Sequence, residues 1–194
     1  MFKEGTEPNA LGDEPNGAPV INPDSLSNRA ERLVVDFLKG SDIGFSSIEL
    51  TSIFDRNDRN GIDAVAEITG GGKIAIDITF SGGEKLKEKE KRNLTTPCVF
   101  LHDENGKAVG DSIPRVLIKE NSQVNWTTLA KEADERGGDL ISAMGDAVAK
   151  RKKVDLLRQI VKQMTGLSRY DDEYRRKGRT ALQIFQDKLE ELAA

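Results

Sequence analysis

Two alternating segments joined by three glycines constrain the fold of this chain more than any other feature. Residues 62–68 and 73–80 each alternate side chains with the period of two that is typical of β-strands. Between them, Thr69-Gly70-Gly71-Gly72 has the backbone freedom that a tight turn requires. We therefore expect an antiparallel hairpin in which Thr69 pairs with Lys73 across the three glycines.

This hairpin carries acidic side chains on one face. Asp77 lies between isoleucines in the middle of its strand, where an acid is a poor choice for stability alone. In the expected register Val65 lies opposite Asp77 and Asp63 lies opposite Thr79, so that the two aspartates are diagonal neighbours. Diagonal neighbours are about 7–8 Å apart at the backbone, and a slip of one residue would separate their faces. At that spacing two carboxylates can share one divalent cation.

The metal-binding chemistry open to the chain is limited by its composition. It has one cysteine, Cys98, and one histidine, His102, which excludes a disulfide within the chain and argues against a Cys/His zinc cluster. Cys98 is expected in a buried strand that His102 ends. A bound metal would therefore be a hard ion held by carboxylate oxygens, Mg²⁺ or Mn²⁺.

The remaining pattern predicts an α/β fold, with a small mixed sheet in the order α-β-β-β-α-β-β that is flanked by helices and followed by a C-terminal helical tail. Helices are expected over residues 24–40, 83–94, 126–136, 140–165 and 171–192, and further strands over 46–54, 98–102 and 115–119. Residues 55–61 and 103–114 are expected to be loops. The predicted organisation is a disordered segment over 1–23, an α/β core over 24–122 and a helical extension over 123–194.

Hydropathy predicts a soluble, cytoplasmic protein. The chain has 194 residues, of which 37% are hydrophobic and 32% charged. It has no apolar stretch near the roughly 18 residues that a membrane span needs, and its first residues lack the apolar core of a signal peptide.

The predicted order of elements resembles that of the PD-(D/E)XK nuclease superfamily, which includes restriction endonucleases and archaeal Holliday-junction resolvases. This order is helix, strand, strand with Asp63, turn, strand with Asp77, helix, strand. The resemblance covers about residues 24–102. It implies a divalent metal held by Asp63 and Asp77, with the carbonyl of Ile78 as a further ligand. Glu31 resembles the helix glutamate that some resolvase-like members add to the site.

The chain departs from that pattern at two positions. Ile62 precedes Asp63 where proline is common, which is a harmless variation. Thr79 stands where the pattern expects a lysine, which would position the attacking water and stabilise developing negative charge. A lysine from the next helix can take that role, and of Lys85 and Lys87 we favour Lys85.

Basic residues gather near the C-terminus although the formal net charge is −4. Residues 150–179 contain eleven Lys or Arg against four acids. A local basic zone of this kind predicts a surface for DNA phosphates, and its alternative is a solvated helix face. The candidate contacts are Lys150, Arg151, Lys152, Lys153, Arg175, Arg176 and Lys177.

Three functions are compatible with these features. The first is a Mg²⁺-dependent endonuclease acting on DNA. The second, favoured by Thr79, is a catalytically degenerate nuclease-like module that binds nucleic acid or a protein partner. The third is an interaction protein whose C-terminal helices form a homodimer or dock on a partner. Leu156 and Ile160 are the candidate contacts of the homodimer.

Overall fold

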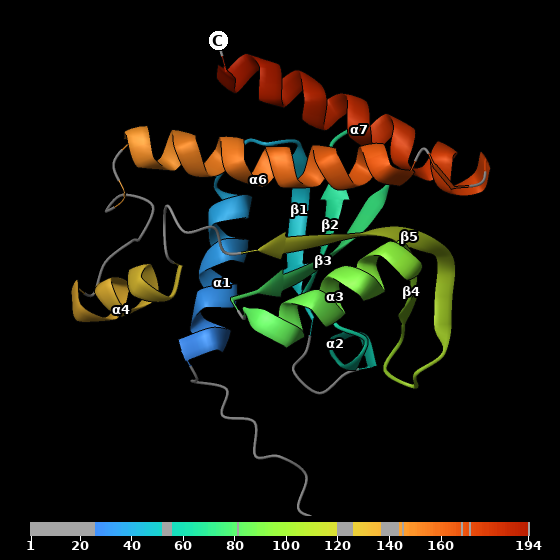
Figure 1. Cartoon of the computed structure of the whole chain (residues 1–194), viewed down its shortest axis with the longest axis horizontal. Helices are drawn as coiled ribbons and strands as arrows, with labels where there is room; N and C mark the ends of the chain where they lie inside the picture. The colour runs from blue at the N-terminus through green and yellow to red at the C-terminus, as the bar shows by residue number, and fades with distance from the viewer. Residues whose placement is uncertain are drawn as a thin grey trace, which may run out of the picture.

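The computed structural model describes residues 26–51, 56–80, 82–119, 126–136, 144, 146–167, 169–170 and 172–193. Its centre is a five-stranded mixed sheet in the order β1-β2-β3-β5-β4, in which β3 and β5 are parallel and the other neighbours antiparallel (Figure 1). The strands are β1 (Phe45–Leu50), β2 (Ala64–Ile68), β3 (Lys73–Thr79), β4 (Cys98–His102) and β5 (Ala108–Lys119). The predicted α/β class with a mixed sheet is confirmed.

Helices flank this sheet, and two of them run together along one side of the molecule (Figure 1). The described helices are α1 (Leu26–Lys39), α2 (Arg56–Arg59), α3 (Gly83–Thr95), α4 (Trp126–Arg136), α6 (Asp146–Leu167) and α7 (Asp172–Ala193). The two that run together are α6 and α7. The short helix α2 lies in a segment predicted to be a loop. Its four residues are all polar and show no apolar periodicity, so the sequence does not indicate a helix there. The predicted disordered segment lies outside the described residues.

The C-terminal helices help to build the main hydrophobic core. Ile74, Ile76 and Ile78 of β3 are buried together with side chains of α1, α6 and α7. Leu156 and Ile160 of α6, considered above as homodimer contacts, are 2% and 0% exposed in this core. They are therefore unavailable to a second subunit, and the stripe that suggested a dimer is explained by packing within the chain.

The β2–β3 hairpin has a register that differs from the predicted one by two residues. Val65 pairs with Ala75 and Glu67 with Lys73, because Ile68 closes the turn by donating its N–H to the carbonyl of Gly72 at 3.0 Å. A shift of two residues keeps every side chain on its predicted face. The ladder ends at the pair Ala64 and Ile76, and Asp63 lies directly beyond it, where its N–H donates to the carbonyl of Ile76.

Two further boundaries differ from the prediction. Strand β5 begins at Ala108, so the predicted loop is shorter, and β1 ends at Leu50, whereas the predicted strand ran to residue 54. Gly178 lies against Leu167, where a Cβ atom would meet the leucine side chain at 3.1 Å, so this glycine serves helix packing. Among the described residues, none of the helices combines the length and hydropathy needed to cross a bilayer.

Candidate functional site

The candidate site lies where the β2–β3 ladder ends. Asp63 is hydrogen-bonded to both chain neighbours of Asp77, since its N–H donates to the carbonyl of Ile76 at 2.8 Å and its Oδ2 accepts from the N–H of Ile78 at 2.5 Å. These bonds replace regular ladder pairing and hold the Asp63 carboxylate at the edge of β3. The expected proximity of the two aspartates is thus a consequence of main-chain contacts.

Helix α3 covers Asp77 with two cations. The Nζ of Lys89 lies 2.6 Å from Oδ1 of Asp77, and Nη2 of Arg92 lies 2.7 Å from Oδ2. Lys89 and Arg92 are three residues apart, so they share one face of the helix. Asp77 is only 1% exposed, and burial of a carboxylate is costly unless it has such partners.

Lys89 also reaches the main chain beside the acids. Its Nζ donates to the carbonyl oxygen of Ile78 at 2.9 Å. Both main-chain polar groups of Ile78 are therefore used, because its N–H binds Asp63 and its carbonyl binds Lys89. One ammonium group, two carboxylates and one carbonyl meet around this residue.

A glycine makes room for Arg92. Gly61 has a φ of +71°, and a Cβ atom built there would lie 2.2 Å from Nη2 of Arg92. Any larger residue at this position would have to displace the guanidinium group. The loop before β2 thus takes part in forming the Arg92–Asp77 ion pair.

The electrostatic environment of Asp63 differs from that of Asp77. Burial, followed by the negative charges of Asp77 and Glu31, raises the pKa of Asp63 to about 7, against the opposing effects of Lys89 and the Ile78 N–H. Glu31 of α1 therefore acts on the site electrostatically. At neutral pH a positive charge placed beside Asp63 would favour its ionised form.

The residues expected to replace the missing lysine are placed differently from the prediction. Thr79 is buried on the Asp77 face, whereas Lys85 and Lys87 are exposed on α3. Lys89, one turn beyond Lys85, is the lysine at the acids. Sequence reasoning missed it because α3 has a basic residue on nearly every turn, and only the docking of the helix selects one of them.

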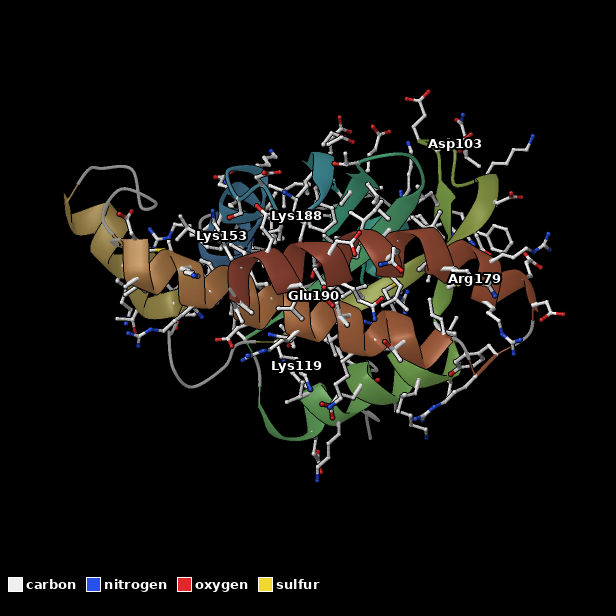
Figure 2. All side chains as sticks on the ribbon, turned by 90° about the horizontal axis from the view of Figure 1, so that it is seen from above. Asp103, Lys119, Lys153, Arg179, Lys188 and Glu190 are labelled. Atoms are coloured by element: carbon white, nitrogen blue, oxygen red, sulfur yellow. The ribbon has the colours of Figure 1, made fainter. Side chains whose placement is uncertain are left out.

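The predicted basic surface is divided and in part buried. Lys152 is 2% exposed, with its Nζ 4.8 Å from the centre of the Trp126 ring, and so is unavailable for nucleic acid. Figure 2 shows Lys153 and Arg179 toward opposite ends of the α6–α7 pair. Lys153 and Arg179 therefore belong to different parts of the predicted surface.

The other predicted contacts have different surroundings. Lys150, Arg151 and Arg176 are exposed, and Arg175 forms an ion pair with Asp172 at 3.3 Å. The side chain of Lys177 lies outside the described parts of the chain.

The donor set at the site suits one kind of metal ion. The donors are the carboxylates of Asp63 and Asp77 and the carbonyl of Ile78, each of which is engaged within the protein. All are oxygens, which fit a hard cation such as Mg²⁺. Across the described residues, no group of three or more His, Cys, Asp and Glu side chains is arranged to hold a metal ion. A cation here would depend on two carboxylates, a carbonyl and water.

Comparisons of the chain with protein-family models, with curated proteins and with solved structures found no match.

Proposed function

We propose that this protein is a metal-dependent endonuclease that hydrolyses phosphodiester bonds in DNA. The observation that carries the proposal is the meeting of Asp63, Asp77 and the Lys89 ammonium at the Ile78 peptide, with Lys89 2.6 Å from Asp77 and 2.9 Å from the Ile78 carbonyl. The resemblance of the element order to the PD-(D/E)XK superfamily points in the same direction. The proposal includes a cytoplasmic location.

In this proposal each group has a separate role. Asp63, Asp77 and the Ile78 carbonyl hold Mg²⁺ or Mn²⁺, and Glu31 adds negative charge at the edge of the site. A bound cation would lower the pKa of its water and neutralise charge on the phosphate. Lys89 stabilises negative charge that develops on the phosphate oxygens. Thr79 cannot take this role because its side chain is uncharged. Arg92 fixes the orientation of the Asp77 carboxylate.

One observation favours the alternative of a degenerate nuclease-like module that binds nucleic acid or a protein partner. Both oxygens of Asp77 are engaged by cations of the protein itself, Lys89 and Arg92. Such pairing neutralises the carboxylate without a metal ion. In the endonuclease, by contrast, Asp77 would have to give up one of these contacts in order to hold a metal ion.

The experiment that separates these functions is plasmid nicking with Mg²⁺ or Mn²⁺, measured together with the thermal shift that each ion causes. For the endonuclease we expect nicking and a metal-dependent rise in Tm, both lost in Asp77→Asn. Asp111→Asn is the matched control, because Asp111 is exposed on β5. Nicking that persists in Asp77→Asn would contradict the endonuclease, and DNA binding without nicking in the wild type would favour the degenerate module.

A further inference from the structure

A cleft with a volume of 980 Å³ lies beside the candidate site. Helices α3 and α6 form its walls, with Leu94 and Gln163 among their contributions, and residues 115–119 of β5 form its floor. Figure 2 shows Lys119 between these two helices. The cleft is therefore a groove between α3 and α6 over the outer part of β5.

The charged side chains around this cleft are predominantly basic. Arg115, Lys119, Lys162 and Arg169 line it, and Glu90 is the acid among its lining residues. Glu90 is paired with Lys119 at 2.6 Å. Lys162 and Arg169 are exposed. From Lys162, α6 continues for five residues to Leu167, a rise of about 7–8 Å, before the chain reaches Arg169. Charges spread over that distance fit a polyanion better than a single small anion.

Arg115 supplies a buried cation with unused donors. It is only 5% exposed, and its Nη2 donates to the carbonyl of Asn60 at 2.9 Å. Its Nε and Nη1 have no hydrogen-bond partner in the described structure. A buried guanidinium with two unpaired nitrogens is costly unless a ligand or water completes it. Arg115 is also close enough for Asp77 and Asp63 to act on its charge, which links the cleft to the acids.

The wall formed by α6 is held in place by two glutamines. Gln163 binds the N–H and carbonyl of Leu117 at 2.8 and 2.9 Å, and Gln159 binds those of Lys119 at 2.9 and 3.2 Å. Because both glutamine amides are hydrogen-bonded to β5, they fix the shape of the cleft. Recognition of an anion then falls to the basic side chains, Arg115, Lys162 and Arg169. Tyr170 adds an aromatic ring to the lining, and such rings can stack with unpaired bases.

We propose that the cleft between α3 and α6 binds the phosphates of a single nucleic acid strand, with Arg115 as the buried anchor and Lys162 and Arg169 as outer contacts. The inference rests on the proposed function, because it treats the cleft as the path along which a strand reaches Asp63 and Asp77. Binding itself needs neither metal nor cleavage, and so it can be tested separately.

The test is fluorescence anisotropy of a labelled single-stranded oligonucleotide with the full chain in EDTA, over a range of salt concentrations. We expect the double variant Lys162→Gln, Arg169→Gln to bind about tenfold more weakly. The slope of log affinity against log salt should fall by about 1.4, because each lost phosphate contact removes about 0.7. The control is Arg32→Gln, Lys39→Gln, which removes two exposed charges, also seven residues apart, from α1 and should bind like the wild type.

Two further arms make the result decisive. Arg115→Met should weaken binding at least as much as the double variant does, and the double variant alone decides the test where Arg115→Met does not fold. The second arm measures binding of inorganic phosphate to the wild-type protein, for comparison with binding of the oligonucleotide. The proposal is overturned by unchanged binding of the oligonucleotide to the double variant, by an equal loss in the control, or by wild-type protein that binds inorganic phosphate but not the oligonucleotide. Asp77→Asn distinguishes the two proposals, since it should abolish nicking and leave this binding intact.

Discussion

The ammonium group of Lys89 lies 2.6 Å from Oδ1 of Asp77, although twelve residues separate them in the chain. This contact identifies Lys89, and not the exposed Lys85, as the lysine of the candidate site. We predict that Lys89→Met lowers the nicking rate by about 100-fold or more, since a positioned proton donor or charge contributes at least that much.

Lys85→Met is the matched control for this prediction, because it removes the same charge from the same helix. It should retain the wild-type nicking rate. Equal losses in the two variants would show that the charge of α3 matters only through its general field.

The pH dependence of stability should report the environment of Asp63. Its pKa in the folded protein is raised from 3.8 to about 7, chiefly by burial. A carboxyl group with a raised pKa favours folding when protonated, so its contribution is lost as pH rises from about 4 to about 7. The loss is at most about 1.4 kcal/mol per pH unit.

Chemical denaturation between pH 4 and pH 8 measures this effect. We expect Asp63→Asn to flatten the decline and to raise the free energy of unfolding relative to wild type at pH 8. Asp111→Asn, at an exposed position of β5, should leave the pH profile unchanged. A profile for Asp63→Asn that parallels the wild type would contradict the burial of this charge.

Gly61 should be required for the ion pair between Arg92 and Asp77. Gly61→Ala introduces a Cβ at 2.2 Å from the Arg92 guanidinium and also strains a positive φ. Gly110→Ala is the control for strain, because Gly110 has a similar φ of +67° and open space around it. We expect backbone strain to lower the free energy of unfolding of both variants by about 1 kcal/mol. The decrease should be larger for Gly61→Ala.

Equilibrium unfolding of these variants in the wild-type and Arg92→Ala backgrounds isolates the contact. The additional loss in Gly61→Ala should disappear when Arg92 is absent. If it persists, the cause lies in the backbone of the loop and not in the displaced guanidinium.

Gln163 should contribute to stability by completing the edge of β5. The N–H and carbonyl of Leu117 have this one side chain as their partner, and Leu117 is 2% exposed. Gln163→Leu leaves both groups unpaired, which costs about 1–3 kcal/mol. Hydrogen exchange of the Leu117 amide should accelerate correspondingly. Gln183→Leu, at an exposed position of α7, is the control and should change neither quantity.

The local sequence is sufficient to determine the hairpin and the face of its acids. Alternation in two strands and a glycine-rich turn place Asp63 and Asp77 on one side, and the shift of two residues in register does not alter this, because the side-chain period of a strand is two. Helix α4 and strand β4 also have the predicted bounds, since their apolar patterns end at recognisable turn residues.

Tertiary structure alone decided which cations meet those acids. In α3, several lysines and Arg92 occupy successive turns, and only the docking of the helix on the sheet selects Lys89 and Arg92. Arg115 reaches the site through the parallel pairing of β5 with β3, between segments separated by a helix and a strand. The burial of Lys152 and the separation of the basic residues along α6 and α7 have the same origin. Local periodicity specifies the faces of each element, whereas contacts between elements depend on packing that acts over the whole chain.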